Sequence, residues 1–422
     1  MVLLIQKMEA ASKAEAASIK GEFMYENTTK AAKLWTPEFL SMSGSNFLLF
    51  ISQYIMIAAL PIYIMDSLGG GELEAGMAMT FFQIGTVTAR PLAGRLIDGI
   101  DKRRLLRIVA VLFIVIMGAF LVLPGILGIY GLRLAHGALF AVATTAAAAL
   151  AVLVLPPARK GTGIGYFALS TNLAMVVGPM LGLLIIGALG ARVMFAFLTA
   201  CAVLTAVLLL WRKLPDEIMQ PSRRRRKGMS LRDFFERRSV PAAFLGGLVF
   251  FAYGGVLTFL PLYARSLGMQ EETSLFYAVF AAVIVVSRPL IGRLFDRFGP
   301  DATVWPGFVA FGLGMVLLGG VESIVGLFAA AAVLGLGFGA LSPAFQTLAV
   351  TSAPPARSGV ATATYFWSLD ISVGLAAVLL GFAATAFGYP FLYGIVLPAV
   401  IVGNAICYFF WRKTARGGRR RR

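Results

Sequence analysis

The stretch Arg90-Pro-Leu-Ala-Gly-Arg-Leu-Ile-Asp98 occurs a second time in this chain, almost letter for letter, as Arg288-Pro-Leu-Ile-Gly-Arg-Leu-Phe-Asp296. Seven of the nine residues are identical, and the copies lie 198 positions apart. At the same offset PPARKG at 156–161 meets PPARSG at 354–359, and at nearly that offset LPIY at 60–63 meets LPLY at 260–263. Three matches at nearly one spacing indicate an internal duplication.

Composition places both copies in a membrane. Of the 422 residues, 59% are hydrophobic and 14% charged, against roughly 45–50% apolar and 25% charged in a soluble domain. Apolar blocks such as 105–123 and 193–210 recur along the chain, and a helix needs about 20 such residues to cross a bilayer. Because lipid cannot satisfy backbone polar groups, each block must be helical. The predicted fold class is an all-α membrane protein.

Twelve transmembrane helices in two pseudo-symmetric six-helix halves account for the apolar blocks. We expect a tail at 1–38, a first half at 39–211, a basic linker at 212–238, a second half at 239–411 and a basic tail at 412–422. The expected spans are 39–64, 75–94, 105–123, 129–151, 163–187 and 193–211, then 241–263, 273–292, 302–319, 323–349, 359–384 and 391–411. Two parallel repeats of this kind predict a substrate cavity at the midplane and alternating access.

The distribution of basic residues predicts the orientation. The net charge is +17, and 32 of the 37 Lys and Arg residues fall in the termini and alternate connections, whereas the intervening connections hold only Arg192 and Arg265. By the positive-inside rule, both termini are expected in the cytoplasm. The run 223–227 is then interpreted as facing anionic membrane lipid rather than nucleic acid. A multi-pass protein of the bacterial inner or plasma membrane follows.

Few residues are available for enzyme chemistry. Cys201 and Cys407 both lie in apolar blocks, which gives no support for a disulfide or a thiolate metal site. The chain has one histidine, no His-Glu-x-x-His pair and no clustered carboxylates. We therefore expect no cofactor, no metal and no enzyme activity.

Two further patterns carry a resemblance to a known family. Gly94-Arg-Leu-Ile-Asp98, followed by basic residues, and its better-matching copy Gly292-Arg-Leu-Phe-Asp296-Arg resemble the loop signature of the major facilitator superfamily. The first copy departs from it at Gly99 and at Asp101. A second family motif is similar to Arg133-Leu-Ala-His136-Gly, in which a histidine replaces the usual glutamine.

The fifth span resembles the motif of the antiporter branch. Gly165, Gly178-Pro179 and Gly182 keep its spacing, while Ala174 and Leu183 stand where the motif has glycines. The ordinary alternative is close helix packing by small residues. The whole pattern most resembles bacterial drug:proton antiporters, which implies a monomeric, proton-coupled exporter of small amphipathic compounds. A proton symporter, an exporter of one sugar, amino acid or metal chelator, and a transport-dead sensor or scaffold are the alternatives.

The resemblance implies a cytoplasmic gate in the duplicated loop. Asp98 and Asp296 would each lie beside a helix N-terminus of the other half in one conformation, the first-half copy dominating; a solvated ion pair is the alternative. Arg90 and Arg288 would latch the gate or extend to lipid headgroups.

Asp370 is the carboxylate placed deepest in a span, and we interpret it as the proton-coupling residue. Because an ionised carboxylate is costly in hydrocarbon, burial would favour its protonated form unless a cation such as Arg133 holds it charged, and either state can couple. His136, one turn from Arg133, is the second candidate. A structural aspartate bonded to a neighbouring helix and an ordinary bundle histidine remain the alternatives.

The cavity is expected to take polar lining from the first span and aromatic lining from the second half. Asn46 and Gln53 are seven residues apart and share a helix face, although helix–helix hydrogen bonding explains them equally well. Tyr253, Tyr365 and Trp367 would provide aromatic walls for an apolar or cationic ligand.

Overall fold

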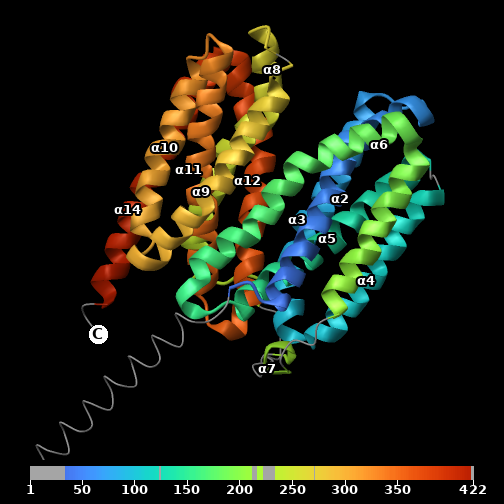
Figure 1. Cartoon of the computed structure of the whole chain (residues 1–422), viewed down its shortest axis with the longest axis horizontal. Helices are drawn as coiled ribbons and strands as arrows, with labels where there is room; N and C mark the ends of the chain where they lie inside the picture. The colour runs from blue at the N-terminus through green and yellow to red at the C-terminus, as the bar shows by residue number, and fades with distance from the viewer. Residues whose placement is uncertain (1–33, 123–124, 212–215, 222–232, 270, 420–422) are drawn as a thin grey trace, which may run out of the picture.

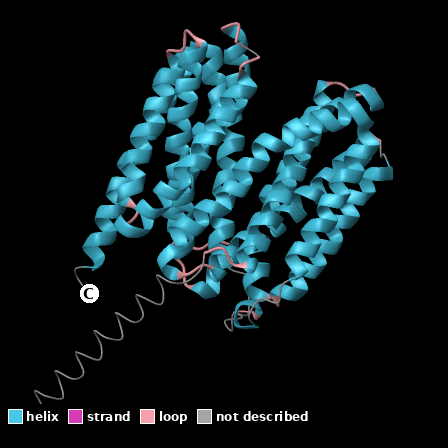
Figure 2. Ribbon diagram, viewed as in Figure 1, coloured by secondary structure: helices cyan, strands magenta, loops and turns pink. Residues whose placement is uncertain are grey.

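The computed structural model describes residues 34–122, 125–211, 216–221, 233–269 and 271–419. Most of the expected N-terminal tail, the basic run 223–227 and the last three arginines lie outside this part of the chain. The described residues are helical apart from short turns, and they contain no strand (Figure 2).

Two groups of helices stand side by side in Figure 1, the first coloured blue to green and the second yellow to red. The first group, here called the first half, contains α2 (Pro37–Leu68), α3 (Glu72–Gly99), α4 (Lys102–Ala119), α5 (Ile126–Val154) and α6 (Lys160–Trp211). The second half contains α8 (Val240–Ser266), α9 (Thr273–Phe298), α10 (Asp301–Gly319), α11 (Ile324–Thr351), α12 (Ser358–Phe387) and α14 (Leu397–Arg419). Each half has its own apolar core.

The sequence repeat is also a structural repeat. Helix α5 begins at Ile126 and α11 at Ile324, and α6 begins at Lys160 and α12 at Ser358, which are both offsets of 198. Short 3-10 turns at Pro157–Arg159 and Pro355–Arg357 precede α6 and α12 at the same offset. Residues 198 apart can therefore be compared between the halves.

Within the described residues, ten helices are long and apolar enough to cross a membrane. One of them, α6, is 52 residues long and is interrupted at Gly190, whose φ of 83° breaks the helical path. Positive φ is accessible to glycine without steric cost, so this position allows the chain to turn within one continuous run.

The departure from the loop signature at Asp101 has a local structural role. Asp101 is the N-cap of α4, and its side chain accepts the backbone N–H of Arg104 at 3.1 Å. An N-cap aspartate satisfies an otherwise unpaired helix donor. The first copy of the loop therefore keeps a defined turn by starting the next helix with a cap.

Candidate functional site

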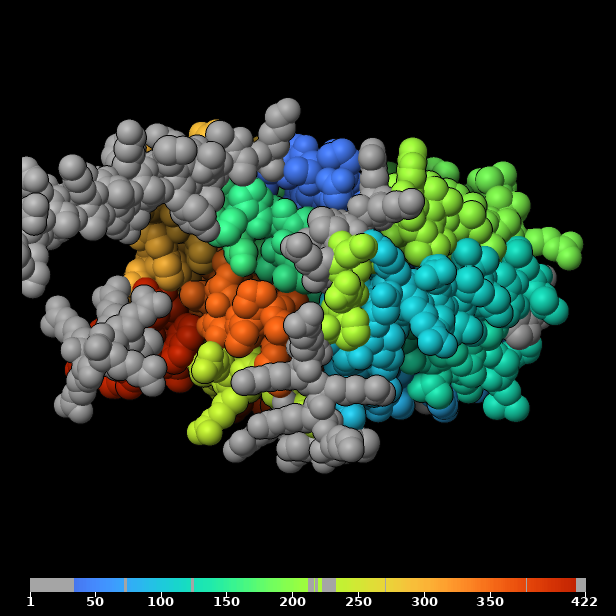
Figure 3. Space-filling view, turned by 90° about the horizontal axis from the view of Figure 1, so that it is seen from below, coloured from blue at the N-terminus to red at the C-terminus, as the bar shows by residue number. Residues whose placement is uncertain are grey.

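The two halves meet along a seam formed mainly where α3 contacts α12 and α6 contacts α9. In Figure 1 the halves meet toward the lower end and diverge toward the upper end, and Figure 3 looks onto the lower end, where their surfaces adjoin. The lower end is called the closed end here. It holds the duplicated loops.

Asp98 joins the halves at the closed end. It lies in the last turn of α3, and its carboxylate accepts the backbone N–H groups of Gly359 and Val360, both at 2.9 Å. These donors belong to the first turn of α12, where N–H groups lack helical partners and the helix dipole is positive. The carboxylate of one half thus binds the helix N-terminus of the other.

Asp296 makes the equivalent contact from the second half. Its carboxylate accepts the N–H of Gly161 at 2.8 Å and that of Thr162 at 3.0 Å, in the first turn of α6. The Thr162 hydroxyl donates a third hydrogen bond at 2.6 Å. Both copies of the loop signature are therefore engaged in the same conformation.

Glycines allow the halves to approach at these contacts. A Cβ on Gly94 would lie 2.8 Å from the Val360 Cα, and a Cβ on Gly292 would lie 2.8 Å from the Thr162 Cα. Distances below 3.0 Å to backbone atoms require the backbone to move. A side chain at either glycine would push the halves apart.

Arg90 and Asp370 form an ion pair across the seam, nearer the middle of the helices. The Arg90 Nε donates to the Asp370 Oδ2 at 2.7 Å, which joins α3 to α12. The Arg90 Nη1 donates to the hydroxyls of Thr144 at 2.7 Å and Thr145 at 3.2 Å. The ring of Phe366 lies 4.9 Å from its guanidinium carbon. Asp370 therefore has a buried cation from the other half as its partner.

The structure pairs Asp370 with Arg90 and not with Arg133, the cation that the sequence suggested. Arg133 is fully buried within the first half, where it donates to the Ala78 carbonyl and the Gln53 Oε1, both at 3.3 Å. The Phe82 ring lies 4.4 Å from the guanidinium carbon. Arg90, which is two helical turns before Asp98, reaches Asp370 instead because α3 faces α12 and α5 packs behind it.

His136 belongs to the Arg133 cluster and not to the seam. Its Nδ1 lies 3.1 Å from the Arg133 Nη1, and its ring packs against Phe82 and Phe113. Because an arginine only donates, Nδ1 must accept, and the neutral ring then carries its proton on Nε2. That Nε2 atom is buried without a hydrogen-bond partner in the described structure.

The expected cavity residues do not gather in one place. Asn46 is buried and donates to the Ser170 and Thr171 hydroxyls at 2.8 and 2.9 Å, which is a helix–helix contact between α2 and α6. Gln53 is engaged by Arg133. Tyr253 reaches across the seam, with its hydroxyl 2.7 Å from the Met175 sulfur.

Two aromatic candidates lie within the second half. The Tyr365 hydroxyl is buried and donates to the Ser342 carbonyl at 2.8 Å, and the Trp367 ring packs against Phe235 at 4.9 Å. Of Tyr253, Tyr365 and Trp367, therefore, only Tyr253 makes a hydrogen bond to the opposite half.

The family model of the Major Facilitator Superfamily matches residues 42–369 and 271–422. The chain belongs to the Major Facilitator Superfamily. It is similar to an uncharacterised MFS-type transporter of Pseudomonas aeruginosa strain UCBPP-PA14, with 28% identity over 91% of this chain and 95% of the relative. An uncharacterised MFS-type transporter of Burkholderia pseudomallei strain 1106a is 27% identical over 92% of this chain and 95% of its own length.

Solved structures share the fold at low sequence identity. The human organic anion transporter MFSD10 has a TM-score of 0.71 at 13% identity, covering 88% of this chain and all of the other. FucP in the outward conformation has a TM-score of 0.70 at 16% identity, covering 89% and 99%. The chain is thus a multi-pass membrane transporter of the major facilitator fold, and the family indicates transport rather than enzyme catalysis.

The glycine and proline pattern in α6 that resembles the antiporter-branch motif forms a close helix contact in this structure. A Cβ on Gly178 would lie 2.5 Å from the Tyr54 Cβ, and one on Gly182 would lie 3.0 Å from the Ile55 carbonyl oxygen. Pro179 lies within α6 between them. These residues pack α6 against α2, whereas Gly165, nearer the start of α6, faces Arg288 on α9.

The sequence did not predict three residues that contact the Arg90–Asp370 ion pair. Thr144 and Thr145 look like ordinary small residues in an alanine-rich span, yet their hydroxyls hold the Arg90 guanidinium. Gln83 donates to the Asp370 backbone carbonyl at 3.4 Å. Helical spacing could have identified Gln83, because Gln83 and Arg90 are seven residues apart and share one face of α3.

Proposed function

We propose that this chain is a proton-coupled exporter of small amphipathic compounds in a bacterial inner membrane, working by alternating access. The observation that carries the proposal is the Arg90–Asp370 ion pair, which links the two halves away from the closed end. Protonation of Asp370 would break this ion pair between the two halves, and so would couple proton binding to their relative movement. The proposal includes cytoplasmic termini, so that the closed end faces the cytoplasm.

The proposal includes twelve spans, which the helix lengths support. At about 1.5 Å per residue, the 52 residues of α6 are about 78 Å long, whereas the hydrocarbon core is about 30 Å thick. The break at Gly190 therefore divides α6 into two spans. Together with α3, which connects two of the ten candidate helices, this gives six spans in each half.

Alternating access is supported by the kind of contacts at the closed end. Asp98 and Asp296 bind helix N-termini through hydrogen bonds that water can replace when the halves separate. Neither contact requires covalent or metal bonds. The two contacts follow the internal repeat, so the halves can rock apart at this end as rigid bodies.

Asp370 is suited to carry the proton. Its side chain is 20% exposed, so water can deliver a proton to the carboxylate, whereas the Arg90 guanidinium, 3% exposed, is already protonated and accepts none. A proton bound to Asp370 removes the negative charge that Arg90 holds and weakens the link between α3 and α12. The seam can then open, and the proton is released on the other side in exchange for substrate.

The test is uphill transport in sealed liposomes with an imposed pH difference, using a panel of fluorescent amphipathic cations as probes. Asp370→Asn is expected to insert and bind these probes but not to concentrate them. Asp66→Asn, at an exposed carboxylate near the end of α2, is the matched control and should transport normally. Retained pH-driven accumulation in the Asp370 variant would move the proton site elsewhere, with His136 next in line.

Proton movement in the same liposomes separates the alternatives. Antiport requires protons to move against the direction of the probe, and a symporter moves both in one direction. A sensor or scaffold shows neither flux.

A further inference from the structure

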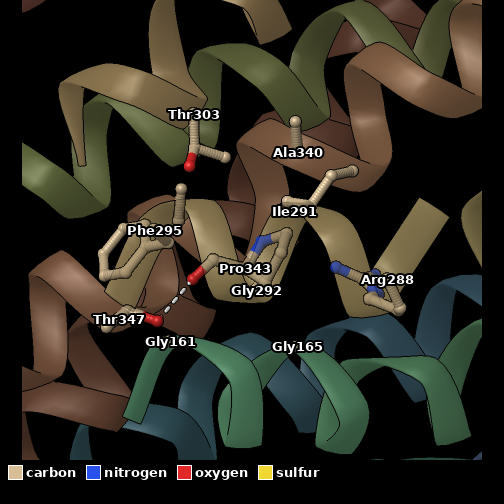
Figure 4. Close-up of a pocket in the computed structure, with 11 residues that line it drawn as sticks. Gly161, Gly165, Arg288, Ile291, Gly292, Phe295, Thr303, Ala340, Pro343 and Thr347 are labelled. Carbon is tan, nitrogen blue, oxygen red and sulfur yellow. Dashed lines mark hydrogen bonds between the residues drawn. The ribbon is translucent and has the colours of Figure 1, made fainter. Parts of the chain in front are cut away.

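The space beside Arg288 at the seam is too small for an organic ligand. Its volume is about 10 Å³, close to the minimum that one water molecule needs. Figure 4 shows Gly161 and Gly165 of α6 facing the residues of α9 and α11 that enclose this space. A larger space lies on the outer face of the first half.

An open groove of about 630 Å³ runs between α4 and the last part of α6. In Figure 1 these two helices form the side of the first half that is turned away from the second half. The six lining side chains are all apolar, and they are Ile114 from α4 and Val203, Ala206, Val207, Leu210 and Trp211 from α6. The groove therefore faces lipid with an apolar wall.

The groove has the depth of one lipid leaflet. Val203 and Trp211 are eight residues apart, about 12 Å along the helix, and one leaflet is half of a hydrocarbon core about 30 Å thick. Trp211 ends α6 and is 71% exposed. Because tryptophan is enriched at the membrane–water interface, we place this end of the groove at the level of the headgroups.

The interface end of the groove adjoins the basic start of α4. Arg103 forms an ion pair with Asp216, which is five residues beyond Trp211. The Lys102 Nζ donates to the Gln220 carbonyl at 3.0 Å. These two contacts hold the end of α6 beside the first turn of α4.

Two arginines of α4 are available to a ligand at this end. Arg104 and Arg107 are exposed, and within the described residues neither takes part in an ion pair. Arg107 is seven residues from Ile114 and shares its helix face, which is the face that lines the groove. Residues three apart on a helix are neighbours, and like charges there repel each other. One anion between the two guanidinium groups would remove this repulsion.

The second half fills the corresponding place with its own side chains. The position 198 residues after Arg107 holds Trp305, whose ring packs against that of Tyr408 of α14 with 5.7 Å between the centroids. Asp301 stands 198 residues after Arg103 and accepts a hydrogen bond from the same tyrosine. Where the first half has cations, the second half thus has an aromatic ring and a carboxylate.

We propose that the groove between α4 and α6 binds one anionic phospholipid, with an acyl chain along the apolar lining and the phosphodiester at Arg104 and Arg107. Basic sites between transmembrane helices recognise anionic headgroups, and an acyl chain gains close contacts with the apolar wall. A zwitterionic lipid would bring its ammonium group near the two arginines. Every lipid contact belongs to the first half, so the site is independent of the proposed proton coupling.

The test is thermal unfolding of the purified full-length protein in a mild detergent, titrated with dioleoyl phosphatidylglycerol, dioleoyl phosphatidylcholine or inorganic phosphate. Phosphatidylglycerol is expected to raise the unfolding midpoint saturably, and native mass spectrometry should retain one such lipid per protein. Phosphatidylcholine has the same acyl chains without net charge, and inorganic phosphate has the charge without a chain. Neither is expected to raise the midpoint.

Charge variants test the headgroup contact. Arg107→Gln changes an exposed side chain, so the variant should fold. It should need about tenfold more phosphatidylglycerol for the same rise, the value of about one hydrogen bond to a charged group. Arg293→Gln makes the same change at an exposed arginine of α9 and should keep the wild-type response.

Size variants test the chain contact. Val207→Trp places a ring in the groove from a position that is 46% exposed, and it should abolish the response to phosphatidylglycerol. Val309→Trp, at a 70% exposed position of α10, should keep the response.

Four results would overturn the proposal. An equal rise with phosphatidylcholine would mean unselective lipid contact, and a rise with inorganic phosphate would mean a free anion at the arginines. A dimer in light scattering that Val207→Trp dissociates would mean that a second copy of the chain occupies the groove. An unchanged response in Arg107→Gln would remove the headgroup contact.

Discussion

Replacing each seam carboxylate by its amide tests how strongly the closed end is held. An asparagine at 98 keeps one acceptor oxygen and turns an NH₂ group toward the N–H of either Gly359 or Val360. One of the two hydrogen bonds of Asp98 is therefore lost. At 296 the amide also loses one N–H partner, because the Thr162 hydroxyl can rotate to bond either amide atom.

The magnitude follows from these counts. Losing one hydrogen bond to a charged group costs about 1.5–3 kcal/mol, and losing the charge at a helix N-terminus costs about 0.3–1 kcal/mol more. The sum, about 2–4 kcal/mol, corresponds to at least about 30-fold in the ratio of closed to open seam, at 1.4 kcal/mol per factor of ten. We expect Asp98→Asn and Asp296→Asn to shift this ratio equally. The family resemblance implies instead that the substitution at Asp98 has the larger effect.

Alanine separates the two sites. Asp98→Ala removes two hydrogen bonds and Asp296→Ala removes three, so the second should be costlier by about one hydrogen bond, or roughly tenfold. Spin labels at the exposed residues Arg104 and Arg297, in a background without Cys201 and Cys407, report the distance between the halves at this end. An Asp98→Asn shift tenfold larger than that of Asp296→Asn, or equal alanine effects, would refute the hydrogen-bond count.

Three further predictions follow from the same structure. A cysteine at Ser222 should resist a membrane-impermeant label in intact cells, because the positive-inside rule places the linker in the cytoplasm; labelling would reverse the orientation. Gly137→Ala should prevent stable folding, since its Cβ would lie 2.1 Å from the Phe82 carbonyl oxygen, whereas Gly118→Ala, with 4.0 Å to its nearest neighbour, should unfold at the wild-type temperature. Arg90→Lys should lose most uphill transport while binding is retained, because one ammonium cannot replace a fork that holds Asp370 and Thr144 together; normal accumulation in liposomes would contradict this.

The helices, the repeat and the seam carboxylates were all predictable from the sequence. Apolar length predicts spans because lipid leaves the backbone no other way to satisfy its hydrogen bonds. For the pairs Gly94–Asp98 and Gly292–Asp296, the resemblance to the family's loop signature predicted a contact between the halves, and the structure places both pairs at that contact. Local pattern alone left a solvated ion pair as the alternative.

The partner of Asp370 was not predicted, because it depends on how far each residue lies from a contact between distant segments. Arg90 precedes Asp98 by eight residues, or about 12 Å along α3, and Asp370 follows Gly359 by eleven, or about 16 Å along α12. Since Asp98 bonds Gly359, the two side chains come to similar depth on facing helices. Arg133 starts from the other end of its span and is turned into the first half. This register becomes calculable only after the Asp98 contact is known.

Under the proposed proton coupling, the asymmetry between the two sides of the seam bears on the number of protons moved. The repeat duplicates the arginine, the glycines and the loop carboxylate, but an aspartate follows only in α12, and Asn172 stands at its place in α6. An amide does not titrate. Of the two arginines, therefore, only Arg90 has a neighbour at this position, Asp370, that can take up and release a proton. A single titrating link between the halves therefore favours one proton per transport cycle, and a second carboxylate would be needed for two.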